Sequence, residues 1–289
     1  MKKQKILVIG ASGFLGKALM QTLSKNFDVV GTFHSNPSPG LIQLDLSDSL
    51  QFQKTLANTA PDIVVLAAAE ANVDSYEKNP AISERQLVSA EIIAEWCEEN
   101  NSLLVFISTD FVFDGRKGKY GENDSPNPIN TYGKNKAEIE KIVQGVEKHL
   151  VLRLSTLYGL PLSSEKFVGK AIFKLLKGER VQAAVDWKRS PTLTNDVALA
   201  LEKLLKNKQY GLFHAAGSTS HSMYDIAIAI AREFNVPLAL IEQGKGAELK
   251  LPAKRPLDTT LDISKIRKLG IQMSSLENGL GFVHKNMGK

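Results

Sequence analysis

Short apolar runs alternate with amphipathic stretches over the first half of the chain. The apolar runs are rich in β-branched residues and predict strands, whereas apolar residues that recur every three or four positions predict helices. The expected strands cover residues 5–9, 27–33, 41–44, 62–68, 103–107 and 150–154. The expected helices cover residues 14–23, 49–58, 80–99 and 134–146. This alternation produces βαβ units, so it predicts an α/β fold of the Rossmann type, with a doubly wound parallel sheet covered by helices on both faces.

The third of these helices has a recognisable start, because Asn79 suits an N-cap and Pro80 suits the first helical position. The rest of the chain is less regular, with helices expected at 165–176, 195–206 and 222–234 and a strand at 212–215. In the helix at 165–176, Leu176 is expected to face inward and Gly178 suits the C-terminal cap. The expected domains are 1–160, rejoined by about 190–217, and a smaller C-terminal lobe at 161–189 and 218–289.

Composition narrows the class of protein. With 43% hydrophobic and 23% charged residues, the 289-residue chain is typical of a globular protein. Its net charge of +5 is scattered, which favours small anionic ligands at least as much as a nucleic-acid backbone, and no nucleic-acid or membrane partner is expected. The longest apolar run, 63–69, is too short for a membrane span, and five scattered histidines predict no metal site. Cys97 is the single cysteine, so no internal disulfide can form and a cytoplasmic location is expected.

A glycine-rich turn, GASGFLG, joins the first expected strand to the first expected helix. Gly10, Gly13 and Gly16 allow a tight turn and a close approach of the backbone to a pyrophosphate, and the helix N-terminus then faces the phosphates. Glycines also end strands for structural reasons alone, but this position at the head of a βα series predicts dinucleotide binding.

The end of the second expected strand bears on the choice of cofactor. NAD-binding proteins usually carry an acidic residue there for the adenosine ribose, whereas this chain has Thr32, Phe33, His34, Ser35 and Asn36. Without a carboxylate to repel a 2′-phosphate, NADPH is the favoured cofactor. No arginine is present to select the phosphate, so NADH stays open as an alternative.

Three side chains suggest proton-transfer chemistry. Ser108, Thr109 and Asp110 follow the fifth expected strand, at the sheet edge where open α/β sheets bind ligands. Tyr132 and Lys136 are four residues apart and share one face of a helix. A nearby ammonium favours the phenolate form of a tyrosine, so Tyr132 could exchange a proton with a substrate oxygen that Thr109 positions. Asp110 is expected to organise the loop, as is Asp114.

These motifs together resemble the extended short-chain dehydrogenases, and within them the dTDP-4-dehydrorhamnose reductase family. The stretches that carry the resemblance are GASGFLG (10–16), LDLSD (44–48), AAAEANVDSYEKNP (67–80), STDFVFDG (108–115), PINTYGKNK (128–136), RLSTLYG (153–159), SPTLTNDVALAL (190–201) and KRPLDTTLDISK (254–265). The combination of STDFVFDG with a downstream YGKNK is the most specific part, since the glycine turn is shared by the whole superfamily.

The resemblance implies a reductase that uses NAD(P)H on the 4-keto group of a nucleotide-linked deoxysugar, with the smaller lobe binding the substrate. It implies catalytic roles for Thr109, Tyr132 and Lys136. The residues that it places around the cofactor, besides Tyr132 and Lys136, are Gly10, Ser12, Gly13, Phe14, Leu15, His34, Asp45, Leu46, Ala67, Ala68 and Ala69. The residues that it places around the substrate are Val112, Phe113, Thr156, Arg189 and Arg255.

Several departures from the family pattern keep alternatives open. Thr156 stands where rhamnose-forming members generally have a tryptophan, and Gln86 stands where an asparagine is common. Lys188 and Arg189 add two cations, which could meet a substrate diphosphate or form a solvated pair; Arg255 could clamp a phosphate or pin the chain's tail. The RLSTLYG stretch also resembles the regulatory beta subunit of methionine adenosyltransferase, a relative that binds NADP and acts through its partner. A regulatory subunit, another sugar-nucleotide epimerase or dehydratase, and a homodimer therefore stay open.

Overall fold

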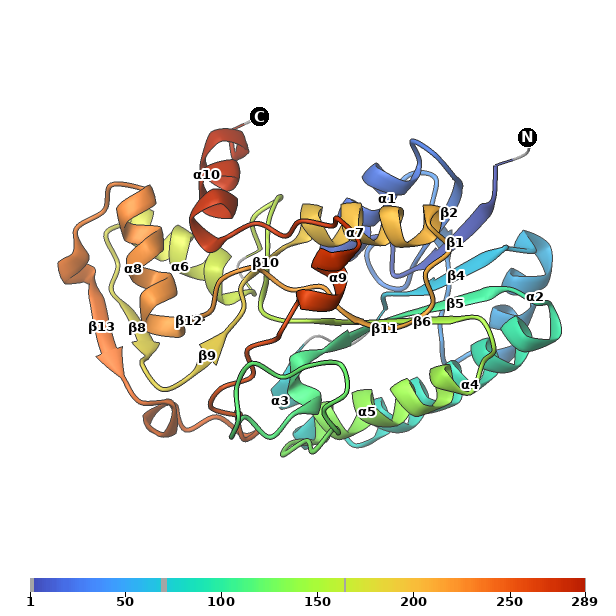
Figure 1. Cartoon of the computed structure of the whole chain (residues 1–289), viewed down its shortest axis with the longest axis horizontal. Coiled ribbons are helices and arrows are strands. Elements are labelled where there is room, and N and C mark those ends of the chain that lie inside the picture. The colour runs from blue at the N-terminus through green and yellow to red at the C-terminus, as the bar shows by residue number, and fades with distance from the viewer. Residues whose placement is uncertain (1–2, 69–71, 164, 289) are drawn as a thin grey trace. The chain divides into compact units, whose positions relative to one another are not determined.

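The computed structural model describes residues 3–68, 72–163 and 165–288. It contains a seven-stranded sheet in the order β11-β6-β5-β4-β1-β2-β3 (Figure 1). These strands are β1 (Lys5–Ile9), β2 (Asp28–Phe33), β3 (Ile42–Gln43), β4 (Ile63–Leu66), β5 (Leu103–Thr109), β6 (His149–Leu154) and β11 (Gly211–His214). The β1–β2, β1–β4, β2–β3 and β4–β5 pairings are parallel, which confirms the expected sheet of the Rossmann type.

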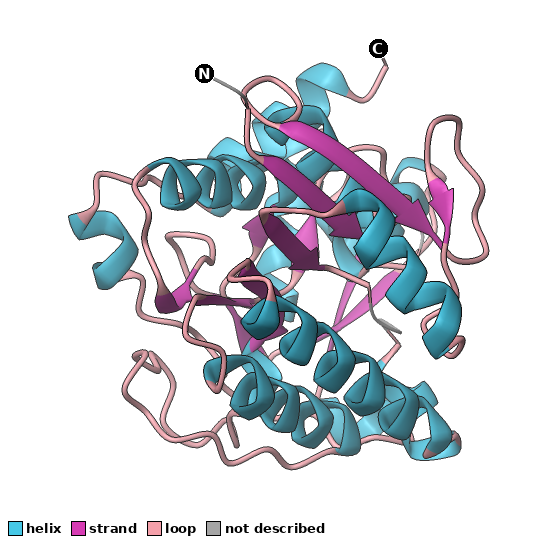
Figure 2. Cartoon of the chain, turned by 90° about the vertical axis from the view of Figure 1, so that its right-hand side faces the viewer, coloured by secondary structure: helices cyan, strands magenta, loops and turns pink. Residues whose placement is uncertain are grey.

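Helices cover both faces of this sheet (Figure 2). On one face, α1 (Phe14–Leu23) packs on β1 and β2. On the opposite face, α4 (Ala81–Glu99) and α5 (Thr131–Gln144) lie side by side and pack on β5, with α2 (Ser49–Thr59) and α3 (Val73–Lys78) beside them. Apolar residues of β1, β4, β5 and α4 form the core under these helices, including Leu7, Val64, Phe106, Ile93 and Cys97.

The order of the strands creates a switch point between β1 and β4. From β1 the chain continues outward through β2 to β3, and it then returns to β4 on the other side of β1. Gly10 follows β1 directly, and Ala67 and Ala68 follow β4. Ligands of open α/β sheets bind in the crevice that such a reversal leaves at the carboxyl ends of the strands. The glycine turn therefore lies where a fold of this kind is expected to bind its ligand.

The chain divides into two compact units. Unit 1 comprises Met1–Thr109, Asn130–Arg153 and Leu201–Phe213, and it contains the sheet described above. Unit 2 comprises Asp110–Ile129, Leu154–Ala200 and His214–Lys289. The helix α7 (Thr194–Lys206) runs from one unit into the other along the chain.

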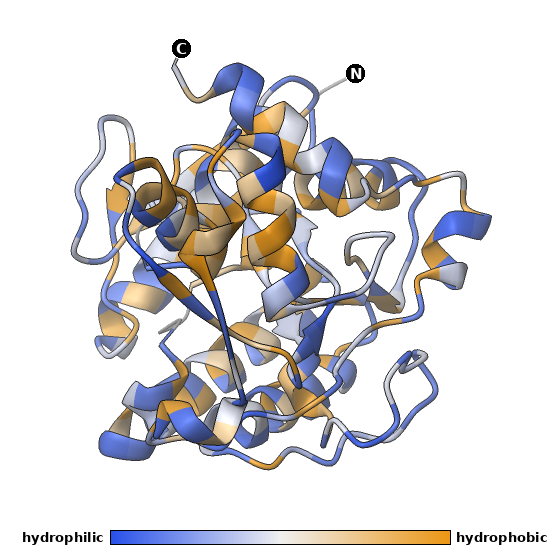
Figure 3. Cartoon of the chain, turned by 90° about the vertical axis from the view of Figure 1, so that its left-hand side faces the viewer, coloured by the Kyte–Doolittle hydropathy of each residue, from blue (hydrophilic) through white to orange (hydrophobic). Residues whose placement is uncertain are grey.

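Unit 2 is built around α6 (Phe167–Leu176), α8 (Met223–Glu233) and α10 (Leu276–Asn286), with α9 (Ser264–Lys268) near its end. Its strands pair in twos: β10 (Thr192–Leu193) with β7 (Leu157–Tyr158), β12 (His221–Ser222) with β9 (Lys188–Arg189), and β13 (Ile241–Gly244) with β8 (Val181–Ala184). Short 3₁₀ turns are η1 (Asp110–Val112), η2 (Leu238–Leu240) and η3 (Gly246–Leu249). Hydrophobic and hydrophilic residues alternate along these helices (Figure 3), and the apolar faces of α6, α8 and α10 form the core of this unit.

Two local expectations are wrong. Asn79 is the C-cap of α3 rather than an N-cap, and Pro80 occupies the N-cap position of α4. The short helix α3 uses the residues before Asn79, which the sequence pattern did not reveal. Leu176 is 48% exposed, because it lies at the margin of the buried stripe of α6 and the helix ends there. Gly178 follows that end with a φ of 73°, which confirms its role in the cap.

Candidate active site

The glycine turn after β1 is tightly packed. Gly10 has a φ of 92°, and a Cβ on it would lie 2.8 Å from the Cα atom of Ala68. A Cβ on Gly16 would lie 2.1 Å from the carbonyl oxygen of Gly10, to which the backbone N–H of Gly13 donates at 3.0 Å. Side chains are therefore excluded at both ends of the turn. A side chain at Gly10 would meet Ala68, one of the residues expected near the cofactor; Ala69 lies outside the described residues.

The helix α1 begins immediately after this turn, at Phe14, with Gly13 at the N-cap position. Among the described residues, no side chain caps these first N–H groups, and no acidic residue stands in the first turn. Ser12 is half-buried beside this end of the helix, and Leu15 is buried. A positive helix end without a capping oxygen is suited to the pyrophosphate of a dinucleotide, so these residues fit such a cofactor.

The end of β2 carries exposed polar residues and no acid. The side chain of His34 is 69% exposed, and its Nε2 atom lies 3.7 Å from Oδ1 of Asp45. That carboxylate accepts hydrogen bonds from the backbone N–H and the hydroxyl of Ser47, at 2.8 and 2.7 Å, and these bonds lower the pKa of Asp45. The carbonyl of Leu46 accepts a hydrogen bond from the Ser89 hydroxyl, which ties this segment to α4.

Tyr132 and Lys136 lie on α5 and face the same side of it. The helix starts with Asn130, whose side chain accepts a hydrogen bond from the backbone N–H of Gly133 at 2.8 Å, so Tyr132 is fixed within a capped first turn. The Nζ atom of Lys136 lies 5.8 Å from the centroid of the Tyr132 ring and 5.2 Å from that of Phe106. Burial of the Lys136 ammonium lowers its pKa to about 8.

A second tyrosine packs against Tyr132. The ring of Tyr76, on α3, meets it edge to face, with the centroids 5.1 Å apart and the planes at 75°. The Tyr76 hydroxyl donates a hydrogen bond to Oε1 of Gln86, at 2.9 Å. No sequence pattern singles out Tyr76, although it lies in one of the stretches that carry the family resemblance. Gln86, which departs from the family pattern, is the partner of this tyrosine.

Thr109 ends β5, the strand on which α5 packs, and it is 8% exposed. The three residues with expected catalytic roles therefore belong to one unit and to two elements in contact. The structure brings Lys136 and Tyr132 together directly and places Thr109 at the carboxyl end of the neighbouring strand. Their roles in catalysis remain predictions.

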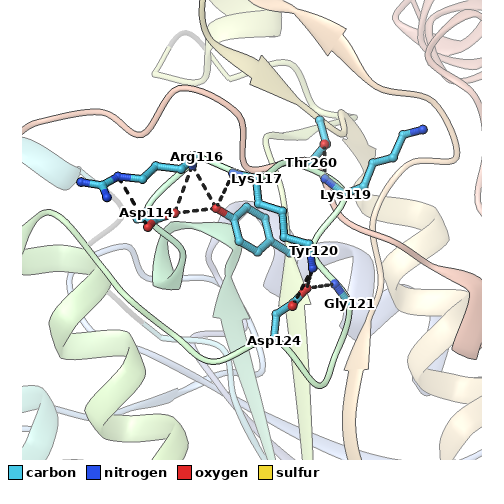
Figure 4. A network of polar contacts seen from close by, with 8 residues as sticks. All are labelled: Asp114, Arg116, Lys117, Lys119, Tyr120, Gly121, Asp124 and Thr260. Carbon is cyan, nitrogen blue, oxygen red and sulfur yellow. Dashed lines mark hydrogen bonds and ion pairs between the residues drawn. The ribbon is translucent and has the colours of Figure 1, made fainter.

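The loop after β5 belongs to unit 2 and is internally braced (Figure 4). The Tyr120 hydroxyl donates to Oδ1 of Asp114 at 2.6 Å and accepts from the backbone N–H groups of Arg116 and Lys117. The Phe113 ring stacks on that of Tyr120, with centroids 4.1 Å apart. Asp114 thus organises the loop, as expected. Val112 and Phe113 are fully buried.

The remaining candidates for the substrate site are in the same unit. Arg189 is only 3% exposed, and its guanidinium donates hydrogen bonds to the carbonyls of Lys188, Pro256 and Leu257. The interpretation of Lys188 and Arg189 as a solvated pair is therefore wrong for Arg189. Arg255 is half-buried and donates to the carbonyl of Ala253; Thr156 is also half-buried.

Other chemistry has little support. Burial raises the pKa of the Cys97 thiol to about 12, so it is not a reactive nucleophile. Within the described ranges, no three His, Cys, Asp or Glu side chains are grouped in a way that could hold a metal ion. None of the helices in those ranges has both the length and the apolar character needed to cross a membrane.

The chain belongs to the family described as RmlD substrate binding domain, whose model matches residues 4–288. This confirms the resemblance found in the sequence motifs.

Known proteins of several kinds are similar to it. Methionine adenosyltransferase 2 subunit beta of Danio rerio is 32% identical over 286 residues, which cover 94% of this chain and 87% of that protein. A probable low-salt glycan biosynthesis reductase, Agl14 of Haloferax volcanii, is 32% identical over 284 residues, covering 94% and 95%. A crystal structure of dTDP-4-dehydrorhamnose reductase from Bacillus anthracis in complex with NADP has a TM-score of 0.85 at 29% identity, covering 98% of this chain and all of that one.

Proposed function

We propose that this protein is an NAD(P)H-dependent reductase that acts on the 4-keto group of a nucleotide-linked deoxysugar. The observation that carries the proposal is the buried ammonium of Lys136, 5.8 Å from the ring of Tyr132, in the same unit as the glycine turn. Similarity to the Bacillus anthracis and Haloferax volcanii reductases supports the same class of reaction.

NADPH is the proposed cofactor, and NADH is the second one to test. The glycine turn and the start of α1 would hold the pyrophosphate. The end of β2 itself carries no acid for the adenosine ribose, and its His34 lies 3.7 Å from the Asp45 carboxylate. When bound, the nicotinamide would supply a hydride to the carbonyl carbon. The similarity to a reductase solved with NADP supports this preference.

Within this proposal the chain's own residues handle the proton. Thr109 donates a hydrogen bond to the carbonyl oxygen and fixes its position. Tyr132 gives its phenolic proton to that oxygen as negative charge develops there. Lys136 makes this transfer easier, because its ammonium stabilises the phenolate that remains. A pKa of about 8 leaves Lys136 charged over most of the neutral range.

The substrate roles of Val112, Phe113, Thr156, Arg189 and Arg255 remain predictions, as do the extents of the domains, the homodimer and the cytoplasmic location. Arg255 is the best candidate for a phosphate contact among them, because the guanidinium of Arg189 is already committed to three carbonyls.

A second candidate function rests on a different observation. The similarity to the beta subunit of methionine adenosyltransferase extends over 94% of this chain at 32% identity, so a regulatory subunit that binds NADP is also supported. Such a protein would bind the cofactor and a synthetase and would turn over little or no sugar substrate.

The test is an assay of NADPH consumption with a panel of dTDP-4-keto-6-deoxysugars, with the products identified by NMR. The wild type should consume NADPH, and Tyr132→Phe should bind NADPH normally while its turnover falls by about 100-fold or more. Equal turnover in the two proteins would reject the role of Tyr132. Cofactor binding without turnover on any sugar, together with co-purification of a synthetase, would favour the regulatory subunit.

A further inference from the structure

A buried ion pair lies one helical turn beyond Lys136, and the proposed reaction does not use it. The side chains of Glu140, on α5, and Arg153, on β6, are each only 2% exposed. The Nε atom of Arg153 donates to both carboxylate oxygens of Glu140, at 2.9 and 3.2 Å, and its Nη2 atom donates to Oε2 at 2.7 Å. The hydroxyl of Ser108, on β5, donates to the other oxygen of Glu140. The carboxylate is therefore held from two strands at once.

The partners of Glu140 are adjacent to the residues with proposed catalytic roles. Ser108 precedes Thr109 on β5, and Glu140 follows Lys136 by four residues on α5. A lysine and a glutamate at this spacing lie on one face of a helix and can form an ion pair. Here they do not: within the described part of the chain, no ion pair joins Lys136 to a carboxylate. The ammonium lies over the rings of Phe106 and Tyr132 instead.

We propose that Arg153 is a positioning residue that keeps the Glu140 carboxylate away from Lys136, so that the ammonium stays directed at Tyr132. This rests on the proposed reductase function for its catalytic meaning, but the geometry of the charges is independent of it. If Arg153 were removed, Glu140 would keep the Ser108 hydroxyl, and among the described residues of unit 1 the other buried cation is Lys136, one turn away on α5.

Other charged groups around α5 do not offer Lys136 an equivalent partner. α3 carries the half-buried Asp74 and also Glu77, whose carboxylate accepts hydrogen bonds from the backbone N–H and the hydroxyl of Thr131. Among the described residues, neither carboxylate forms an ion pair with Lys136, and Tyr76 of the same helix contributes its ring. β5 carries no acidic or basic residue between Leu103 and Thr109. The charged residues of α4 are all exposed, namely Glu84, Arg85, Glu91, Glu95, Glu98 and Glu99. The other charged residues of α5, Lys134, Glu138 and Lys141, are exposed as well.

If Arg153 acts in this way, the effect of removing it should depend on whether Glu140 is charged. In Arg153→Met the free Glu140 carboxylate should draw in the Lys136 ammonium, which then stabilises the Tyr132 phenolate less well. In the double variant Glu140→Gln/Arg153→Met neither charge remains, so Lys136 should return to Tyr132. A merely structural role for the ion pair would also make Arg153→Met less stable than the double variant, because the single change leaves one buried charge unpaired, but it would leave the midpoint of the Lys136 amine unmoved in a folded protein.

The experiment is an NMR titration of the Lys136 side-chain amine in the cofactor-free protein, with its signal identified by comparison of each protein with its Lys136→Met counterpart. Arg153→Met should raise the midpoint by about one pH unit, and the double variant should return to within a few tenths of the wild type. If Arg153→Met does not fold, Arg153→Lys, which retains the charge on a single-point donor, should shift the midpoint in the same direction by less. An unchanged midpoint in the folded single variant, or an equal shift in the double variant, overturns the proposal.

The same variants can then be compared in turnover. The alkaline limb of kcat/KM for a keto-sugar should move with the midpoint of the Lys136 amine, and kcat should fall roughly tenfold in Arg153→Met and recover in the double variant. A shift in the titration with no turnover in any protein would uphold the charge arrangement and reject the reductase function. Turnover that falls in both variants with an unmoved limb would reject the positioning role and leave the reductase function standing.

Discussion

The ring of Tyr76 meets the ring of Tyr132 edge to face, with the centroids 5.1 Å apart and the planes at 75°. Tyr76 is fully buried, and its hydroxyl is bonded to Gln86 on α4. The aromatic contact restricts the tilt of the Tyr132 ring, and the hydrogen bond fixes Tyr76 in turn. Gln86, a departure from the family pattern, therefore acts on the candidate site through an intervening tyrosine.

Mutations of Tyr76 should distinguish the effect of its ring contact with Tyr132 from the effect of its hydrogen bond to Gln86. Tyr76→Phe keeps the ring and loses the bond to Gln86, so kcat should fall by no more than a few fold. Tyr76→Ala removes the support of the Tyr132 ring and should lower kcat by roughly tenfold or more, since loss of orientation is costly in catalysis. Both variants should retain the wild-type affinity for NADPH, measured by fluorescence titration. Equal effects of the two changes would show that the ring contact does not position Tyr132.

The buried ammonium of Lys136 predicts an unusual dependence of stability on pH. Its pKa is about 8 in the folded chain and 10.5 in the exposed reference state. Between these values the unfolded chain binds more protons than the folded one, so stability should rise with pH across that window. Below it, the ammonium is charged in both states and its burial opposes folding in full. Lys136→Met removes that cost, so the variant should be more stable than the wild type near neutral pH.

The measurement is the free energy of unfolding by urea in the cofactor-free protein, near pH 7 and near pH 10. The advantage of Lys136→Met should shrink as pH rises through about 8, because Lys136 then loses its proton in the folded state. Lys134→Met, at an exposed position of the same helix, is the control and should show no such trend. A constant difference between Lys136→Met and the wild type at both pH values would mean that Lys136 titrates normally.

Much of unit 1 could be predicted from periodicity, because its strands are apolar runs and its helices are amphipathic. The expected bounds of β1 and α1 agree with the structure, and Gly10, at their junction, has the positive φ that a tight turn requires. Unit 2 was harder to predict, since most of its strands have only two residues and leave no periodic pattern. Their pairing depends on contacts distant along the chain, such as His221 with Arg189.

The same holds for the candidate site, where contacts within one helix could be predicted and contacts between distant elements could not. Tyr132 and Lys136 share a helix, so their spacing alone places them together. The partners of Tyr132 and Glu140 come from other elements, and nothing local to Tyr76 or Arg153 reveals them. One signal was available: an arginine within the apolar strand HLVLRL must be paired if it is buried, and Glu140 lies on a helix expected to pack against the sheet. Burial of Arg189 had no such signal, because its three acceptors are backbone carbonyls.

The glycine turn gives a steric prediction. In Gly16→Ala the new methyl group would overlap the carbonyl oxygen of Gly10 at 2.1 Å, so the turn or the start of α1 must move. We expect the affinity for NADPH to fall by at least tenfold, because the N–H groups that face the pyrophosphate shift with the helix. Isothermal titration with NADPH measures this. Gly121→Ala is the matched control, since its nearest neighbour lies 3.9 Å from the new methyl group, and normal cofactor binding by Gly16→Ala would contradict the proposed cradle.

Substitution of Arg189 distinguishes a structural role of this side chain from a role in substrate binding. Its guanidinium satisfies the carbonyls of Lys188, Pro256 and Leu257 and lies 5.1 Å from the centroid of the Phe111 ring. Arg189→Met would leave the buried carbonyl of Pro256 without its donor, while the carbonyls of Lys188 and Leu257 keep backbone N–H partners, and we expect it to lower the free energy of unfolding by about 1–3 kcal/mol. Lys188→Met, at the exposed neighbouring position, should change the free energy of unfolding by no more than about 0.5 kcal/mol.

Urea unfolding of both variants checks these values. The KM for the keto-sugar, measured under conditions where Arg189→Met is folded, distinguishes the structural role from substrate binding. A KM close to that of the wild type is expected from a side chain that braces the segment at 256–257. A large rise in KM with unchanged stability would instead show that Arg189 binds the substrate.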